Sequence, residues 1–254
     1  MADRLLDFTG KSVLITGGSM GIGRAVALAF ARQGGQIAIG DADPRAQETV
    51  DLIVAAGGRA FYQPTDVRKG TEVAALVDAT VERFGGLNCA FNNAGILPAT
   101  LPLADMPDSA FDDIISVDLL GVFLCMKYEI KHMLRAGGGA IVNNASIAGL
   151  VADPGMAPYV AAKHGVIGLT KAGALDYARQ NIRINALAPG LVQTPMTQRW
   201  LDDPKFREII LAHSPVGRAA RPEEITGIVL YLCSELASFA TGQTFVVDGA
   251  QTAH

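Results

Sequence analysis

The sequence has 254 residues, of which 50% are hydrophobic and 18% are charged, and its formal net charge is −4. The charged fraction lies below the usual figure of about 25%, so we expect a large core or apolar surfaces between subunits. No run of Lys or Arg occurs, which argues against a nucleic-acid-binding surface and against contact with anionic membranes. Length alone fits one large α/β domain or two small ones.

Apolar runs that alternate with helical patterns indicate an α/β fold. Strands are predicted at residues 13–16, 37–41, 60–63, 87–92, 140–145, 183–188 and 244–248. Helices are predicted at residues 22–32, 45–56, 71–84, 109–135, 159–180 and 222–234. This alternation is typical of right-handed βαβ crossovers, so we expect a doubly wound, Rossmann-type parallel sheet of about seven strands with helices on both faces. No linker interrupts the pattern, which predicts a single domain over residues 1–254.

The first predicted strand leads into a glycine-rich turn. Gly17 permits a tight turn, Gly21 lets the backbone approach a pyrophosphate, and Gly23 allows close packing of the following helix on the strand. The unpaired N–H groups at the start of that helix favour an anion. Glycines in such loops can serve the backbone alone, but here the strand, the helix and a later acidic residue are all present. We therefore predict that a dinucleotide binds at Gly17, Ser19, Met20, Gly21, Ile22 and Gly23.

Asp41 ends the second predicted strand and indicates which dinucleotide binds. Its carboxylate can accept hydrogen bonds from the hydroxyls of the adenosine ribose, and it would repel a 2′-phosphate. Ser19 and Met20 in the glycine turn offer no cation to attract such a phosphate. The predicted cofactor is therefore NAD.

A second turn of small residues, Asn92 to Gly95, follows the strand at 87–92. Taken alone, a turn rich in Asn and Gly is usual at the end of a strand. Beside a dinucleotide turn, its small residues and amide side chains suit the floor of a nucleotide groove.

Tyr159 and Lys163 lie four residues apart in a predicted helix. Both side chains therefore lie on one face, where an ammonium favours the phenolate that a proton-transfer catalyst needs. Ser146 follows the strand at 140–145, so its hydroxyl lies at the carboxyl edge of the sheet, where open α/β sheets bind ligands. A lone Tyr-x-x-x-Lys is more often an ordinary amphipathic helix. With the dinucleotide turn in the same chain, we interpret Ser146, Tyr159 and Lys163 as catalytic.

In this order the motifs resemble those of the short-chain dehydrogenase/reductase family, in its single-domain branch with TGxxxGIG and YxxxK motifs. The resemblance runs almost end to end, from Thr16 to Gly249. It implies hydride exchange between a nicotinamide dinucleotide and an alcohol/carbonyl pair. It also implies that Tyr159 is the general acid/base, that Lys163 lowers its pKa and binds the nicotinamide ribose, and that Ser146 hydrogen-bonds the substrate oxygen.

The same resemblance implies further contacts with the cofactor. Asp66 would contact adenine, the turn at 93–95 would pack against the adenosine ribose, and Thr194 would hold the carboxamide. The cofactor residues carried over in this way are Asp66, Val67, Asn93, Ala94, Gly95, Pro189, Gly190, Val192 and Thr194.

One position departs from the family pattern. The family usually has Asn in the long helix before the Ser146 strand, where it supports a water in a proton relay to the lysine; here that place holds Asp118. Asp is nearly isosteric with Asn but can only accept hydrogen bonds when ionised. Asp118 is thus a candidate fourth catalytic residue that either joins the relay or turns away from it.

Residues 193–221 break the alternation of strands and helices. This stretch contains three prolines and follows a strand whose end should face the nicotinamide. A long insertion at a ligand edge is more often a lid than a passive loop. Its apolar residues either cover a substrate or bury a short helix, and we favour Met196 and Trp200 as pocket residues.

The other segments of the predicted pocket are mostly apolar and contain no Lys or Arg that could bind a carboxylate or a phosphate. We therefore predict that the substrate is an uncharged, hydrophobic secondary alcohol or ketone. The candidate substrate contacts are Ile96, Ile147, Ala148, Val151, Met156, Met196 and Trp200.

Other ligands are not indicated by the sequence. His132, His164, His213 and His254 share no metal-ligand spacing, so no metal site is predicted. The three cysteines are widely separated in apolar segments, which indicates free thiols in a reducing compartment. No apolar run is long enough to span a bilayer and no signal-peptide pattern is found, so a cytoplasmic protein without membrane contact is expected.

The resemblance also implies a homotetramer. We expect the helices at 109–135 and 159–180 and the last strand to form its contacts. This expectation is supported by apolar residues that exceed what one face of a sheet can bury: Val122, Phe123, Val166, Leu169 and Phe245.

The favoured function is an NAD-dependent short-chain alcohol dehydrogenase or ketone reductase. A rival is a catalytically silent nucleotide-sensing protein on the same fold. Such a sensor could lose Ser146, Tyr159 or Lys163, whereas all three are present. A third hypothesis, reduction of an enoyl double bond, resembles relatives with a wider Tyr-to-Lys spacing, so the shorter spacing favours carbonyl chemistry.

Overall fold

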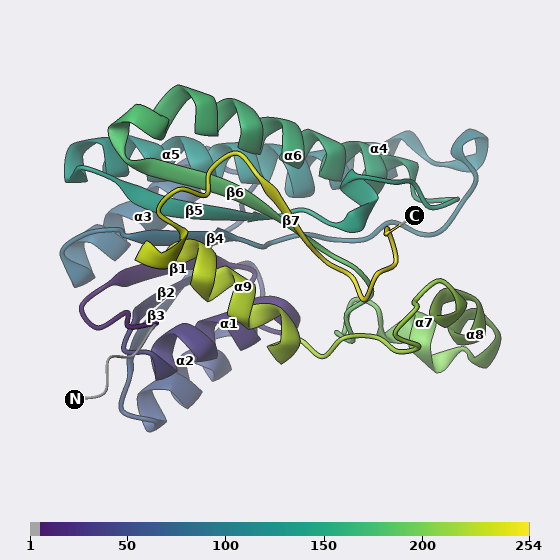
Figure 1. Ribbon diagram of the computed structural model, residues 1–254, viewed down its shortest axis with the longest axis horizontal. Helices are drawn as coiled ribbons and strands as arrows, with labels where there is room; N and C mark the ends of the chain where they lie inside the picture. Colours follow the sequence, from purple (N-terminus) through teal and green to yellow (C-terminus); the bar gives the residue numbers. More distant parts are fainter. Residues whose placement is uncertain (1–5, 254) are drawn as a thin grey trace.

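The computed structural model describes residues 6–253; the first five residues, part of the segment used for the cytoplasmic prediction, and His254 lie outside the described residues. Within that range seven parallel strands form one sheet in the order β3-β2-β1-β4-β5-β6-β7 (Figure 1). The strands are β1 (Ser12–Thr16), β2 (Gln36–Asp41), β3 (Arg59–Pro64), β4 (Cys89–Asn92), β5 (Gly139–Asn144), β6 (Ile182–Pro189) and β7 (Thr244–Val247).

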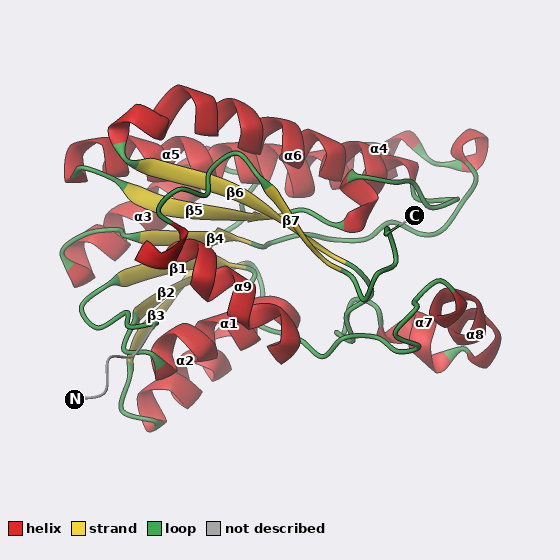
Figure 2. Cartoon of the chain, in the orientation of Figure 1, coloured by secondary structure: helices red, strands yellow, loops and turns green. Residues whose placement is uncertain are grey.

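Helices cover both faces of the sheet (Figure 2). One layer contains α1 (Gly21–Arg32), α2 (Ala46–Ala55) and α9 (Glu223–Cys233), and the other contains α3 (Gly70–Phe84), α5 (Gly121–Ala136) and α6 (Ala157–Tyr177), with α4 (Asp108–Ile114) packed against α6. Two shorter helices, α7 (Gln198–Asp202) and α8 (Pro204–Ala212), project beyond the carboxyl ends of the strands. The predicted doubly wound fold is confirmed.

Alternate residues of each strand enter opposite halves of the core. Ile15 and Phe91 pack against α1 and α9, whereas Leu14 and Ala90 pack toward α3, α5 and α6. Because both faces are covered, the strands read as continuous apolar runs rather than as alternating patterns. This explains why the sequence located all seven strands to within two residues at each end.

The helix predicted at 109–135 is helical throughout, from Asp108 to Ala136, but it is not a single α-helix. A π-helical turn, η2 (Ile115–Leu120), separates α4 from α5, and Asp118 lies within it. A π turn inserts one extra residue into the helical repeat and is frequent at functional sites. The apolar period on either side cannot reveal such a local change, so the sequence predicted one α-helix where the structure has two α-helical segments joined by a π turn.

Residues 193–221 form a loop with two short helices, of which neither has a fully buried residue. The base of this segment is closed by a parallel bridge between Val192 and Ala220, in which the Gln193 N–H donates to the Ala220 carbonyl. At its tip, the Arg199 guanidinium donates to the Pro98 carbonyl at 2.8 Å. The segment is therefore anchored at its base and, through Arg199, to the loop after β4.

Two of the residues offered as intersubunit contacts are buried in the subunit itself. Val122 and Val166 are 3% and 0% exposed and pack between the sheet and its helices, so they support no argument about an interface. Phe123 on α5, in contrast, is 44% exposed, and Leu175 on α6 is 85% exposed. None of the helices in the described range is long and apolar enough to cross a membrane.

Candidate active site

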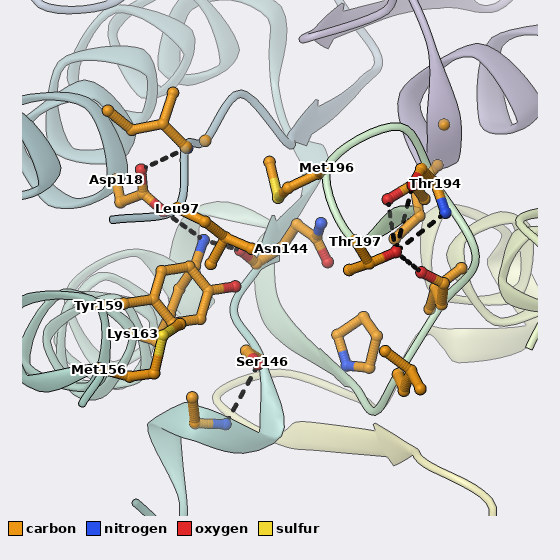
Figure 3. A pocket seen from close by; sticks show the side chains of 18 of the residues that line it. Leu97, Asp118, Asn144, Ser146, Met156, Tyr159, Lys163, Thr194, Met196 and Thr197 are labelled. Atoms are coloured by element: carbon orange, nitrogen blue, oxygen red, sulfur yellow. Dashed lines mark hydrogen bonds and ion pairs between the residues drawn. The ribbon is translucent and has the colours of Figure 1, made fainter. Parts of the chain in front are cut away.

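One large cavity lies at the carboxyl ends of the strands. It has a volume of about 1510 Å³, which exceeds the roughly 300–1,000 Å³ of an ordinary small-molecule site. Every predicted site residue lines it except Gly23. Residues from the glycine turn, from the ends of β2 to β6 and from the 193–221 segment therefore converge on a single space (Figure 3).

The glycine turn at the start of α1 has the geometry that a dinucleotide site needs. Gly17 and Gly21 have φ values of 71° and 55°, in the left-handed region that favours glycine. A Cβ on Gly17 would lie 2.9 Å from the Cα of Ala94, so the two small-residue turns are in direct contact. A Cβ on Gly23 would lie 2.0 Å from the Gly17 carbonyl oxygen, which explains why Gly23 packs behind the turn rather than into the cavity.

Asp41 is fixed by two backbone N–H groups. Its Oδ2 accepts from the Ser19 N–H at 2.9 Å, and its Oδ1 accepts from the Asp43 N–H at 2.9 Å. Asp43 also lines the cavity and is paired with the exposed Arg45. The carboxylates of Asp41 and Asp43 therefore line this end of the cavity, and the Arg45 guanidinium is already bound to Asp43.

Asp66 lines the cavity but its carboxylate is engaged. Arg68 binds it at 2.8 Å, and this hydrogen-bonded pair holds the pKa of Asp66 below its ordinary value. Val67 beside it is buried against Gly121. The contact with adenine that the family resemblance implies for Asp66 would thus come from a carboxylate that is already paired with Arg68.

The second turn joins β1, β4 and β5. The Asn93 amide donates to the carbonyls of Thr16 and Gly17 at 3.1 and 3.0 Å, and Asn144 donates to Asn93 Oδ1 at 2.9 Å. A Cβ on Gly95 would lie 3.0 Å from Asp118 Oδ2. The glycine at this position therefore leaves room for the buried carboxylate behind the turn.

Tyr159, Lys163 and Ser146 lie together at the wall of the cavity (Figure 3). Tyr159 and Lys163 come from α6, and the Lys163 Nζ lies 5.3 Å from the centre of the phenol ring. The Ser146 Oγ accepts from the Ala148 N–H at 3.1 Å, which fixes its orientation at the end of β5. A phenol, a hydroxyl and an ammonium therefore surround one region of the cavity, as the spacing of the motif predicted.

Asp118 forms an ion pair with Lys163. Its Oδ2 lies 3.2 Å from the Lys163 Nζ, and both side chains are buried. Its Oδ1 accepts from the Ile96 N–H at 2.8 Å, while Lys163 also donates to the Asn144 carbonyl at 3.0 Å. Asp118 therefore faces Lys163.

Burial dominates the protonation of this cluster. It raises the pKa of Tyr159 above its ordinary value, while the Lys163 ammonium acts to lower that pKa and the Asp118 carboxylate acts to raise it. Burial alone would lower the pKa of Lys163, but Asp118 and Tyr159 together raise it. Burial also raises the pKa of Asp118, against the attraction of Lys163. The carboxylate of Asp118 thus weakens the effect of Lys163 on the phenol.

The remaining part of the cavity is largely apolar and is formed by the candidate substrate contacts Ile96, Ile147, Ala148, Val151, Met156, Met196 and Trp200. Met196 and Met156 lie on opposite sides of the cavity (Figure 3). Phe206, Ile209 and His213 also line the cavity. The sequence offered Phe206 and Ile209 only as apolar residues of the 193–221 insertion that either cover a substrate or bury a short helix, and it gave no reason to select His213. Among the described residues, no group of His, Cys, Asp and Glu could hold a metal ion.

Known proteins are similar to this chain over almost its whole length. The family model described as enoyl-(acyl carrier protein) reductase matches residues 17–252. The chain is 43% identical to 2,5-dichloro-2,5-cyclohexadiene-1,4-diol dehydrogenase of Sphingobium indicum, over 97% of this chain and 99% of the relative. It is 44% identical to cyclohexanol dehydrogenase of an Acinetobacter species, over 96% of each chain.

A solved structure supports the same assignment. The crystal structure of levodione reductase superposes with a TM-score of 0.92 and 37% identity, over 97% of this chain and 99% of that one. The chain belongs to the short-chain dehydrogenase/reductase family, and it is an oxidoreductase of the alcohol/ketone class. The shorter Tyr-to-Lys spacing is consistent with this class rather than with enoyl reduction.

We expect Asp118→Asn to remain active and to move the acidic limb of the kcat/KM profile for alcohol oxidation to lower pH. The substitution removes the carboxylate that raises the pKa of Tyr159 and keeps the shape of the side chain. The measurement is a pH–rate profile with one alcohol, and Asp112→Asn on the exposed face of α4 is the matched control. An unchanged acidic limb would remove Asp118 from the electrostatics of the phenol.

Proposed function

We propose that this protein is an NAD-dependent dehydrogenase that interconverts uncharged, cyclic secondary alcohols and their ketones. The observation that carries the proposal is the position of Tyr159, Ser146 and the paired Lys163 beside an apolar space in the cavity. A proton-transfer group, a hydrogen-bond donor and a nearby dinucleotide turn are what oxidation of an alcohol requires.

The residues of the cavity fit NAD. The turn containing Gly17 and Gly21 offers backbone N–H groups at the start of α1 for the pyrophosphate. Asp41 and Asp43 suit the free hydroxyls of the adenosine ribose and disfavour a 2′-phosphate. By family resemblance, Asn93, Ala94, Gly95, Asp66 and Val67 would line the adenosine half. Pro189, Gly190, Val192 and Thr194 would line the nicotinamide half.

The lining of the substrate region supports an uncharged ring. The Lys and Arg residues that line the cavity within the described range, Arg68 and Lys163, are each paired with a carboxylate. Among the described residues, the cavity lining therefore contains no Lys or Arg that is free to bind a carboxylate or a phosphate of a substrate. The names of two relatives specify cyclohexanol and a cyclohexadiene diol. A compact apolar ring with one hydroxyl beside Tyr159 is therefore the proposed substrate.

When bound, the nicotinamide would supply the hydride acceptor for oxidation of the carbinol carbon, and Pro189, Gly190, Val192 and Thr194 would hold it. Ser146 would hydrogen-bond the substrate oxygen and hold it beside the Tyr159 hydroxyl. The phenolate form of Tyr159 would take the hydroxyl proton and become the neutral phenol. Lys163 stabilises the phenolate, and Asp118 and the Asn144 carbonyl hold the ammonium in place.

Residues 193–221 are proposed to be the substrate lid. The segment contributes Met196, Trp200 and Phe206 to the cavity wall, and Trp200 and Phe206 have ring centres 6.1 Å apart. The hydrogen bond from Arg199 to Pro98 connects the segment to the loop after β4, across the cavity. Closure of this segment would remove water from the reacting region.

We expect a higher kcat/KM with NAD than with NADP. We also expect a higher kcat/KM for cyclohexanol than for 2-hexanol or for 4-hydroxycyclohexanecarboxylate. The carboxylates at the adenosine end disfavour the extra phosphate, and the apolar wall disfavours a charged ring. Reduced-nicotinamide absorbance measures all these rates.

Asp41→Ala should reduce the preference for NAD, with the exposed Asp51→Ala on α2 as its control. Faster turnover with NADP would contradict the cofactor, and faster turnover of the linear or charged alcohol would contradict the ring.

We expect Tyr159→Phe to lower kcat by roughly 10²- to 10⁴-fold while NADH binding is nearly unchanged, because the substitution removes the acid/base hydroxyl and little else. Lys163→Ala should impair both, since Lys163 is assigned to the phenol and to the ribose. Kinetics and NADH fluorescence titration provide the two measurements. Retention of most activity by Tyr159→Phe would move the proton transfer elsewhere. NADH binding without turnover of any alcohol by the parent would favour a nucleotide sensor.

A homotetramer is proposed for the protein in solution. The exposed apolar residues of α5 and α6, which include Phe123, Leu134 and Leu175, support an interface on this helical layer. We expect light scattering at micromolar concentration to give the mass of four chains. A stable monomer at that concentration would contradict the proposal.

A further inference from the structure

A buried acidic residue lies outside the cavity and has no role in the proposed mechanism. Glu129 on α5 is 0% exposed and does not line the cavity. The polar side chains of Asn92, Asn143 and Thr170 are buried in the same layer of the core at 1%, 0% and 0% exposure. Carboxyl groups are almost never fully buried unless they are paired, so this cluster requires an explanation.

The donors of the cluster are all in use. Asn92 Nδ2 donates to Glu129 Oε2 and to Asn143 Oδ1, both at 3.0 Å. Asn143 Nδ2 donates to Thr170 Oγ1 at 2.9 Å, and Thr170 donates to the Val166 carbonyl at 2.8 Å. These contacts also fix the orientation of the Asn92 amide, since its nitrogen must face two acceptors.

Two acceptors of the same cluster have no donor. Glu129 Oε1 and Asn92 Oδ1 are both buried without a hydrogen-bond partner. They belong to the two groups that are already joined by the Nδ2 to Oε2 hydrogen bond. A proton on the carboxyl group would supply the missing donor, because a carboxylic acid and an amide can form two reciprocal hydrogen bonds.

We propose that Glu129 is a neutral positioning residue that forms a reciprocal acid–amide pair with Asn92 and thereby aligns the ends of β4 and β5 beneath the active site. In this pair Oε1–H donates to Asn92 Oδ1, and Asn92 Nδ2–H donates to Oε2. The pair completes every hydrogen bond of the cluster without placing a charge in the core.

The aligned strand ends carry groups of the active site. Asn92 and Asn143 are register partners at the ends of β4 and β5. The residues that follow them, Asn93 and Asn144, face the other side: Asn93 donates to the Gly17 carbonyl in the glycine turn, and Asn144 donates to Asn93. The Asn144 carbonyl accepts from Lys163 Nζ. A shift between the two strand ends would therefore move both the floor of the cofactor groove and the acceptor that holds Lys163.

Few charged groups surround Glu129. On α5, Cys125 lies one turn away and its own pKa is raised, chiefly by burial and also by Glu129. The neighbouring elements direct their charges elsewhere: Lys163 of α6 is bound to Asp118 of η2, and Arg183 of β6 is bound to carbonyls beside α9. The remaining titratable side chains of these elements lie at the surface or outside the cluster: Glu72, Asp78, Glu82 and Arg83 on α3; Lys127, Tyr128, Lys131, His132 and Arg135 on α5; Tyr159, His164, Lys171, Asp176 and Tyr177 on α6; and Cys89 on β4.

Burial of the Glu129 carboxyl sets the pH range over which the pair is intact. Burial raises the pKa of Glu129 from 4.5 to about 8, opposed by the hydrogen bond from Asn92. Between these values the unfolded chain loses the proton while the folded chain keeps it, so stability falls as pH rises through this range. Above the folded pKa the carboxylate loses the Oε1–H donor, and the acid–amide pair is broken.

Glu129→Gln tests the pair because its side-chain amide can make both hydrogen bonds at any pH. Chemical unfolding is measured at about pH 6 and about pH 9. Between these two pH values, the unfolding constant of the parent should rise on the order of a hundredfold more than that of the Gln variant. Glu82→Gln on the exposed side of α3 is the control for loss of one carboxylate. Equal pH dependence of the unfolding constant in the parent and the Gln variant would contradict a neutral Glu129 in the folded protein.

The positioning role needs separate measurements. NADH titrations at both pH values should show a larger loss of affinity at high pH in the parent than in Glu129→Gln. Under the proposed function, kcat for alcohol oxidation should also fall on the alkaline side in the parent but not in the Gln variant. Glu129→Leu removes the partner of Asn92 Oδ1 and of one Nδ2 hydrogen, while the hydrogen bond to Asn143 remains. This variant should lose NADH affinity and kcat at both pH values where Gln retains them.

The kinetic arm rests on the proposed alcohol oxidation and the NADH arm rests on the proposed cofactor, whereas the unfolding arm rests on neither. If no alcohol is oxidised, that function fails, while the unfolding and NADH measurements still decide the role of Glu129. If Glu129→Leu does not fold, the comparison of the parent with Glu129→Gln remains decisive. Identical pH dependence of NADH affinity in these two proteins would overturn the positioning role.

Discussion

The buried ammonium of Lys163 constrains the organisation of the active site. A charge without partners in a protein interior is strongly unfavourable, so groups from several elements must surround it. Asp118 of η2 supplies a carboxylate, and the end of β5 supplies the Asn144 carbonyl. These contacts hold α6 against the strand end and thereby place Tyr159 at the cavity wall. The position of the phenol thus depends on how the lysine is paired.

The same ion pair reaches the nucleotide side of the cavity. Asp118 also accepts from the Ile96 N–H, and the close approach of its carboxylate requires a glycine at position 95. The turn after β4 is therefore fixed both by Asp118 from behind and by the contacts of Asn93 with the glycine turn. Electrostatics at the lysine and the shape of the proposed cofactor groove are coupled through this single turn.

Beneath this arrangement lies a second polar layer. The Glu129 cluster spans α5, β4, β5 and α6 on the side of the sheet opposite to Asn93 and Asn144. Because adjacent residues on a strand point to opposite faces, each Asn pair can bind different partners on its own side. The two layers together hold the edge of the sheet where the chemistry is proposed.

The sequence by itself determined the features that depend on neighbouring residues. Apolar runs located the strands, glycine positions defined the turn before α1, and the spacing of Tyr159 and Lys163 placed both on one helical face. Tertiary structure alone decided what depends on distant contacts. These include the π turn at Asp118, the burial of Val122 within the subunit, and the pairing of Glu129 with a strand end 37 residues away in sequence. Local propensity is independent of such packing, because a side chain acquires its partners only when separate elements meet.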